Sequence, residues 1–362
     1  MTSMLALRAH SGADALVLED VPVPDPGPRD VVIKVASAGV APGMLRLLES
    51  GAFKHLPTTV GHEAAGTIAQ VGDEVTGLAV GDRVRMHPNL NCGDCRYCRA
   101  GLDMMCAQQA MVGHAFFGAG SAPMYEQYHD GGLAEYVRVP HWLVDLLPDS
   151  VGFDIGAKVH DLANAVRALK CAELPADATL VITAATGTMG TATVKLAEHY
   201  GAARLILVGR DRARLDAVTP LAGSSPVTVV ATGELPDEAA LTQHLRALAP
   251  DGADAVLDYV PTGPVTGQAM AALATGGALV HMGGNLTPLP LPPALLMINC
   301  WRFVGTRACT RADAREVLDL LAQGTLAADE LITHRCPLSD AVKAIDAMQQ
   351  RTDPMWMSVI NP

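Results

Sequence analysis

Four cysteines stand close together in one short segment of the chain: Cys92, Cys95, Cys98 and Cys106. Thiolates at this spacing can surround one tetrahedral zinc ion, and four of them leave no coordination position for a substrate. An iron–sulfur cluster normally takes its fourth cysteine after three residues and a proline, whereas seven residues separate Cys98 from Cys106. The segment is therefore predicted to hold one structural zinc ion per chain, and the chemistry must lie elsewhere.

A second segment, Thr186-Gly187-Thr188-Met189-Gly190, follows an apolar run and opens a helix-length stretch. Gly187 would let the backbone approach a pyrophosphate, Gly190 would let the helix pack on the preceding strand, and the helix N-terminus supplies N–H donors. Ala185 stands where the usual first glycine belongs. This position within an alternating strand and helix series predicts a dinucleotide-binding turn.

The type of dinucleotide follows from the end of the next apolar run, where Gly209 precedes Arg210. An NAD site places a carboxylate there to accept from the ribose hydroxyl, and Gly209 removes it. The Arg210 guanidinium can bind a 2′-phosphate with two hydrogen bonds. NADP(H) is the predicted cofactor, while Arg212 and Arg214 either assist Arg210 or form an exposed helix face.

Two kinds of pattern divide the chain. The first 150 residues contain short β-branched runs separated by turns, among them 30–36, 66–72 and 81–86, which predict a mostly β domain around the cysteines. From about residue 176 onward, apolar runs alternate with helix-length segments, which predicts an α/β fold with a doubly wound parallel sheet. The six candidate strands are 179–183, 204–208, 227–231, 254–259, 277–282 and 303–306.

Composition limits the function classes. A chain of 362 residues suggests two domains, and the formal charge of −12 disfavours nucleic acid or an anionic membrane as partner. The first ten residues lack a secretion signal, no apolar run reaches the length of a membrane span, and the remaining cysteines show no pairing pattern. A cytoplasmic protein acting on a small molecule is expected.

The order of motifs resembles the zinc-containing medium-chain dehydrogenase/reductase family, the alcohol dehydrogenase group. The resemblance implies a GroES-like catalytic domain at 1–152 and 301–362, a Rossmann domain at 153–300, and a homodimer or homotetramer. Leu289 to Ile298 occupies the region where family members pair their sheets across a dimer axis. The motifs are Gly61-His-Glu-Ala-Ala-Gly66, Val80-Gly-Asp-Arg-Val84, the cysteine segment, Gly131-Gly-Leu-Ala-Glu-Tyr-Val137, the glycine turn and Leu331-Ile-Thr-His334.

The expected catalytic metal site departs from the family pattern. Members with a catalytic zinc carry a cysteine where this chain has Ala41 and a proton-relaying hydroxyl where it has Gly43. The resemblance nevertheless places His62, Glu63 and His160 at ligand or catalytic positions. Two imidazoles and a carboxylate form a set that can hold zinc with one open position, so a second, catalytic zinc is an open expectation.

Three functions are compatible with these residues. The first is an NADP(H)-dependent alcohol dehydrogenase that interconverts an alcohol and an aldehyde or ketone. The second is an enoyl or quinone reductase without catalytic metal, in which His62 or His160 donates hydrogen bonds to the carbonyl oxygen. The third is a non-catalytic cofactor-binding protein. An aromatic-bearing insertion at 107–130 either covers the substrate site or fills the core.

Overall fold

The structure is a computed structural model that describes residues 2–12, 16–120, 122–350 and 354–362. The chain forms two compact units: unit 1 comprises 1–160 and 309–362, and unit 2 comprises 161–308. The predicted boundaries, at 152/153 and 300/301, lie slightly before these. Helix α4 (Phe153–Ala172) begins in unit 1 and ends in unit 2. In the described part of the chain, no helix has the length and apolar character needed to cross a membrane.

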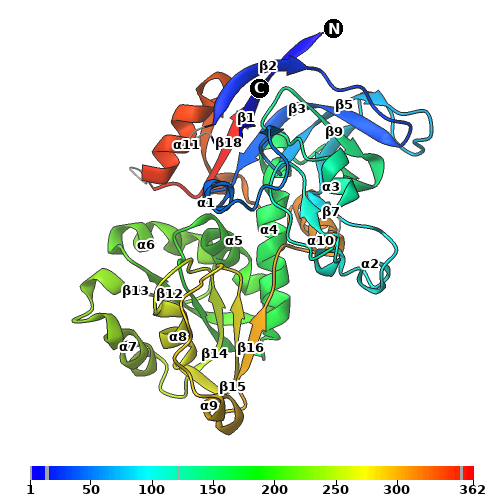
Figure 1. Cartoon of the computed structure of the whole chain (residues 1–362). Coiled ribbons are helices and arrows are strands. Elements are labelled where there is room, and N and C mark those ends of the chain that lie inside the picture. The colour runs from blue at the N-terminus through cyan, green and yellow to red at the C-terminus, as the bar shows by residue number, and fades with distance from the viewer. Residues whose placement is uncertain (1, 13–15, 121, 351–353) are drawn as a thin grey trace. The chain divides into compact units, whose positions relative to one another are not determined.

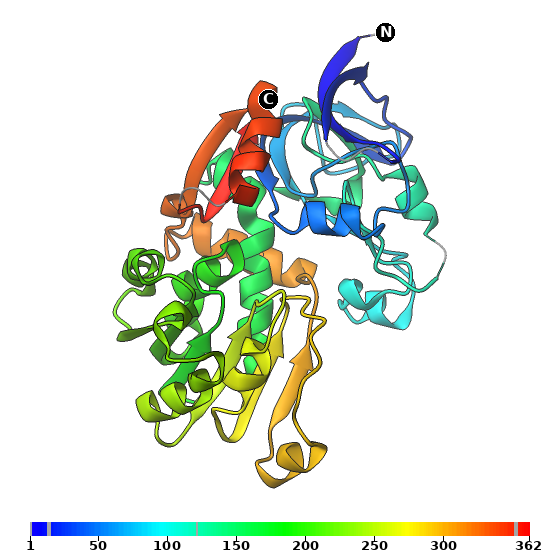
Figure 2. The ribbon, with the colours of Figure 1, turned by 60° about the vertical axis from the view of Figure 1, so that its left-hand side comes forward.

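Unit 1 is built on a seven-stranded, mostly antiparallel sheet in the order β10-β6-β5-β3-β18-β17, with β9 also paired to β3. The last strand, β18, lies beside β3, so strands far apart in the sequence are neighbours in one sheet (Figures 1 and 2). The strands are β3 (Asp30–Val40), β5 (Ala64–Val71), β6 (Arg83–Met86), β9 (Tyr136–Pro140), β10 (Val144–Leu146), β17 (Ile332–Pro337) and β18 (Met357–Asn361).

One face of strand β3 lies against a large apolar core. Val31, Ile33 and Val35 alternate along the strand and join this core with Val84 and Ile360, as expected for a strand rich in β-branched residues. The smaller sheets contain β1 (Ser3–Ala9), β2 (Val17–Pro22) and β4 (Thr58–Thr59), and β7 (Asn89–Leu90) with β8 (Ala110–Met111). The mostly β character predicted for this part of the chain is confirmed.

Short helices border unit 1, and one of them has a defined start. Helix α10 begins after Thr310, whose side chain accepts from the Asp313 N–H while the Asp313 carboxylate accepts from the Thr310 N–H, a reciprocal capping box. The helices are α1 (Met44–Glu49), α2 (Arg96–Arg99), α3 (Pro123–Gln127), α10 (Arg311–Ala322) and α11 (Ala341–Gln350).

Unit 2 contains one parallel sheet in the order β13-β12-β11-β14-β15-β16. Each of the six apolar runs predicted from sequence overlaps one of these strands, and the order reverses between β11 and β14, as in doubly wound folds. The predicted α/β class is therefore confirmed. The strands are β11 (Ala178–Ile182), β12 (Ala202–Gly209), β13 (Val227–Ala231), β14 (Ala253–Asp258), β15 (Leu273–His281) and β16 (Arg302–Gly305).

Helices cover both faces of this sheet (Figure 1). Right-handed crossovers place α5 (Thr188–Ala197) and α6 (Arg212–Val218) on one face. Helices α7 (Leu241–Leu248) and α8 (Val265–Met270) pack together on the other. There Leu241, Leu245 and Met270 join Ile206 and Val256 in one apolar core. Helix α9 (Pro293–Ile298) precedes the edge strand β16.

Candidate functional site

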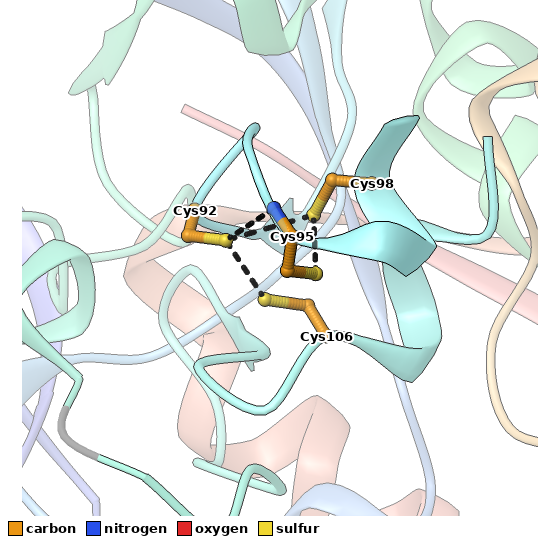
Figure 3. Close-up of side chains that lie close together, drawn as sticks. All are labelled: Cys92, Cys95, Cys98 and Cys106. Carbon is orange, nitrogen blue, oxygen red and sulfur yellow. Dashed lines mark hydrogen bonds between the residues drawn. The ribbon is translucent and has the colours of Figure 1, made fainter. Parts of the chain in front are cut away.

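The four cysteines of the loop converge on one point (Figure 3). Their sulfur atoms all lie within 4.8 Å of one another, with Sγ–Sγ distances of 3.5 Å from Cys95 to Cys98, 3.6 Å from Cys106 to Cys92 and 3.9 Å from Cys92 to Cys98. A tetrahedral zinc ion with Zn–S bonds of about 2.3 Å requires sulfurs about 3.8 Å apart. The four thiols fit the predicted structural zinc ion.

Backbone geometry prepares this loop for a metal. The N–H groups of Cys95 and Gln108 donate to the sulfurs of Cys92 and Cys106, at 3.4 and 3.3 Å. Hydrogen bonding to the Cys98 backbone lowers the pKa of Cys95 to about 7, which favours its thiolate, whereas burial raises the pKa of Cys98 and of Cys106 above the usual value. Gly93 has φ +73°, a left-handed turn in which a side chain would be strained.

The predicted dinucleotide turn joins β11 to α5. Gly187 is the N-cap of α5, a ten-residue helix. The backbone N–H groups of the first helical turn, which lack partners within the helix, therefore follow directly after it. A Cβ on Gly190 would lie 2.6 Å from the oxygen of Ala184 and from Cα of Ala185, so only glycine lets the helix pack this closely. At Gly187 a Cβ would meet only the oxygen of Ala184, at 3.5 Å, which leaves its outer side open for a phosphate.

Gly209 and Arg210 lie at the end of β12, the neighbour of β11. The Arg210 side chain is exposed, whereas Arg212 is held by Glu234 through Nε and Nη2 contacts of 2.8 to 3.0 Å. Asp211 caps α6 by accepting from the Arg214 N–H at 2.9 Å. The structure therefore places Arg210 at the strand end and engages Arg212 elsewhere.

A buried polar network that the sequence reasoning missed lies at the carboxyl ends of β14 and β15. Nδ1 of His281 lies 2.6 Å from Oδ2 of the fully buried Asp258, and Thr266 donates to the same oxygen at 2.8 Å. The N–H of Asn285 donates to Nε2 of His281 at 3.1 Å, so Nδ1 carries the proton shared with Asp258. Ligands of doubly wound sheets bind at this edge. The sequence signal for this network was an Asp and a His, each at the end of one of two successive apolar runs.

His62 and Glu63 lie just before β5, and His160 lies in α4. The rings of His62 and His160 meet edge to face with centroids 5.2 Å apart, and Nε2 of His62 lies 3.9 Å from Oε1 of Glu63. Burial, together with the nearby charge of Lys158, lowers the pKa of His62 to about 3, and burial lowers the pKa of His160 well below 6.5. Both imidazoles are therefore neutral near pH 7.

Two residues outside the predicted set complete this cluster. The ring of His114 lies 4.5 Å from that of His62, and Sγ of Cys309 lies 3.5 Å from Nδ1 of His160. All of these side chains are at least nine-tenths buried. His114 belongs to the aromatic insertion, so a histidine among aromatics was a signal. No sequence signal pointed to Cys309, because it is far from α4 in the chain and only folding brings the two together.

The contacts of Glu63 do not fit a catalytic zinc ion. The Lys158 ammonium donates to Oε2 of Glu63 at 2.5 Å, and both side chains are fully buried. Among the described residues, only the four cysteines bring three or more His, Cys, Asp or Glu donor atoms within 4.8 Å of one another. The donor atoms of His62, Glu63 and His160 therefore do not come together as the expected ligand set. The carboxylate of Glu63 is instead bound to the ammonium group of Lys158.

The aromatic insertion packs into the core of unit 1. Tyr125 and Tyr128 are buried there; the hydroxyl of Tyr125 donates to the His114 carbonyl at 2.8 Å and that of Tyr128 to Asp30 at 2.6 Å. Of the two interpretations of this segment, core filling is favoured for both tyrosines. From the described part of this segment, the ring of His114 contacts that of His62.

Comparison with known proteins agrees with the two-unit fold. Residues 27–149 match the alcohol dehydrogenase GroES-like domain family, and residues 188–323 match the zinc-binding dehydrogenase family. A sorbitol dehydrogenase of Bombyx mori is 29% identical over 356 residues, covering 96% of this chain and 95% of that protein. An NAD-dependent alcohol dehydrogenase of Sulfurisphaera tokodaii is 29% identical over 357 residues, covering 96% of each.

Solved structures share the whole fold. One, from Sinorhizobium meliloti 1021, is assigned to the zinc-binding dehydrogenases and contains NADP; it superimposes with a TM-score of 0.85 at 25% identity over 100% of both chains. A cobalt- and zinc-bound thermostable alcohol dehydrogenase from Pyrobaculum aerophilum gives a TM-score of 0.83 at 25% identity, again over 100% of both chains. The chain is similar to these proteins from end to end.

Proposed function

Because this chain belongs to the zinc-containing medium-chain dehydrogenase/reductase family, we propose that it is an NADP(H)-dependent oxidoreductase that interconverts an alcohol and an aldehyde or ketone. The observation that carries the cofactor choice is the exposed Arg210 beside Gly209 at the end of β12. The similar proteins include an NAD-dependent enzyme and a structure with bound NADP. The choice of cofactor must therefore be argued from this chain's own residues.

NADP(H) fits the residues of unit 2. The N–H groups that follow Gly187 would hold the pyrophosphate, and Thr186, Thr188 and Met189 would line the turn between the glycines. Arg210 would bind the 2′-phosphate with two hydrogen bonds. When bound, this cofactor supplies or accepts the hydride.

In unit 1, neutral imidazoles would meet the substrate oxygen. Nδ1 of His62 and Nδ1 of His114 are buried and make no hydrogen bond within the described chain. A neutral ring nitrogen that carries a proton can donate to a carbonyl oxygen and stabilise the charge that develops there. The proposal assigns this role to His62, with His160 as its neighbour.

The test follows cofactor oxidation at 340 nm with NADPH and with NADH, against a panel of aldehydes, ketones, enones and quinones. Faster turnover of NADPH with an aldehyde or ketone is the expected result. A preference for NADH contradicts the assignment of Arg210. Tight NADPH binding without turnover of any compound supports a non-catalytic role instead.

A second candidate is the reduction of an activated alkene or a quinone without catalytic metal. The Lys158 contact with Glu63 favours it, because a site without zinc offers hydrogen-bond donors rather than a Lewis acid. Charge on the oxygen of an enolate is delocalised and needs less stabilisation than an alkoxide. Turnover of enones without turnover of simple aldehydes supports this candidate.

The proposed enzyme is a homodimer or homotetramer in the cytoplasm. Met297 and Ile298 at the end of α9 are 74% and 66% exposed, and β15 is the only described strand that pairs with the edge strand β16. An exposed apolar surface beside a sheet edge supports pairing with a second copy. In the described part of the chain, the cysteines outside the zinc loop form no disulfide, which supports a reducing compartment.

A further inference from the structure

A buried ion pair engages Glu63, one of the three residues that the family resemblance places at the catalytic metal site. Lys158 and Glu63 both have fully buried side chains, and Nζ lies 2.5 Å from Oε2. Buried ammonium groups are rare unless they are paired, and this one is paired with the carboxylate that would otherwise be free to reach a metal. His62 directly precedes Glu63 in the chain, and its Nε2 lies 3.9 Å from the other oxygen of this carboxylate.

The absence of a side chain at Gly39 makes room for the pair. A Cβ on Gly39 of β3 would collide with Oε2 of Glu63 and lie 2.8 Å from Cδ of Lys158. Glycine at this position, in a strand that otherwise favours branched residues, leaves the space in which the two charged groups meet. Two residues later, Ala41 presents a methyl group where the family's metal-binding thiolate would stand.

These features act together against a metal ion. A divalent cation at His62, Glu63 and His160 would have to displace the Lys158 ammonium from its carboxylate or accept a like charge in contact with its own ligand. It would also lack the thiolate ligand of the family, because Ala41 stands at that position. The sulfur of Cys309 is already in contact with His160 and lies in the interior of unit 1.

We propose that Lys158 permanently replaces the catalytic metal ion, so that this chain holds one zinc ion, at the four cysteines, and none at His62, Glu63 and His160. The inference goes beyond the proposed function, because it concerns metal content and holds for either class of substrate. Lys158 is a positioning residue: it fixes Glu63, and Glu63 borders His62.

The first test counts zinc in the full-length protein after incubation with excess zinc and desalting. One zinc ion per chain is expected in the native protein and in the variant His62→Ala. Two zinc ions in the native protein, or loss of zinc from His62→Ala, would overturn the inference. The outcome is independent of turnover, so a failure of the proposed function leaves it intact.

Cobalt substitution identifies the site without any variant. One Co²⁺ per chain with thiolate-to-metal charge-transfer absorption is expected, since the four cysteines would be its ligands. A second Co²⁺ whose spectrum shows only nitrogen and oxygen ligands would overturn the inference.

A pair of variants tests whether Lys158 is the cause. Ala41→Cys restores the missing thiolate and keeps Lys158, so it should still hold one zinc ion. Ala41→Cys combined with Lys158→Met removes the competing ammonium and should hold two. A second zinc in Ala41→Cys alone, or equal zinc content in both variants, would show that Lys158 does not exclude the metal.

Discussion

Arg212 and Glu234 form a side-on pair at the start of α6, with Nε of the arginine 3.0 and 2.9 Å from the two carboxylate oxygens and Nη2 2.8 Å from one of them. Arg212 is thereby turned toward a loop carboxylate. Arg210 directly follows Gly209, so its guanidinium group lies at the end of β12. The two arginines therefore have different expected roles, although they are only two residues apart.

Arg210→Ala should raise the KM for NADPH by about 10- to 100-fold, since hydrogen bonds to a charged phosphate contribute about 1.5 to 3 kcal/mol. The KM for NADH should change little, because NADH has no 2′-phosphate. Arg212→Ala is the matched control and should leave both values nearly unchanged. Steady-state kinetics with each cofactor measures these effects, and equal losses in the two variants would contradict the assignment.

Cys98→Ser should lose the structural zinc ion and lower the free energy of unfolding by more than about 4 kcal/mol, because loss of a metal is among the most destabilising single changes. Cys300→Ser is the control, since Cys300 is exposed and lies outside the loop. Zinc analysis and urea unfolding provide the measurements. Unchanged zinc in Cys98→Ser would exclude the four-cysteine site.

Lys158→Met should destabilise unit 1 by about 3 to 5 kcal/mol, because it leaves a fully buried carboxylate without its ammonium partner. The double variant Glu63→Leu with Lys158→Met should recover most of this loss, since it removes both charges. Lys343→Met, at a lysine side chain that is 85% exposed, should have almost no effect. Additive losses in the double variant would show that the pair is not energetically coupled.

Stability should fall as pH decreases below about 6.5. Burial keeps His62, His114 and His160 neutral in the folded chain, and their pKa values lie below 6.5, with that of His62 at about 3. Between pH 6.5 and 3 the unfolded chain therefore binds more protons, and for His62 alone the loss at pH 5.5 is about 1.4 kcal/mol.

Urea unfolding at pH 7.5 and 5.5 checks this acid sensitivity. His114→Leu should reduce it, because one buried neutral imidazole is removed. His244→Gln should not, because that side chain is exposed. Identical unfolding free energies at the two pH values would mean that these histidines are protonated in the folded chain.

Met297→Glu with Ile298→Glu should convert the proposed dimer or tetramer to a smaller species, because two charges would enter the apolar surface of α9. Val80→Glu, at a valine of unit 1 that is 66% exposed, is the control and should leave the assembly unchanged. Sedimentation velocity at micromolar concentration measures the outcome. A native monomer would remove the basis for this surface as an interface.

The sequence by itself determined the two kinds of fold and the local sites. Runs of β-branched residues predict strands wherever they occur, and the zinc loop and the glycine turn are formed by residues close in the chain. For this reason the four cysteines, the turn at Gly187 to Gly190 and the six parallel strands of unit 2 could be anticipated. Local spacing carries the information for such features.

Only the tertiary structure decided the state of the site in unit 1. Glu63 and Lys158 are separated by 95 positions, and no periodicity indicates that their side chains meet. The same holds for His160 and Cys309. A sequence shows which residues can bind a metal or a proton, but packing decides which partner each one finds, because buried charges take the nearest opposite charge that the fold supplies.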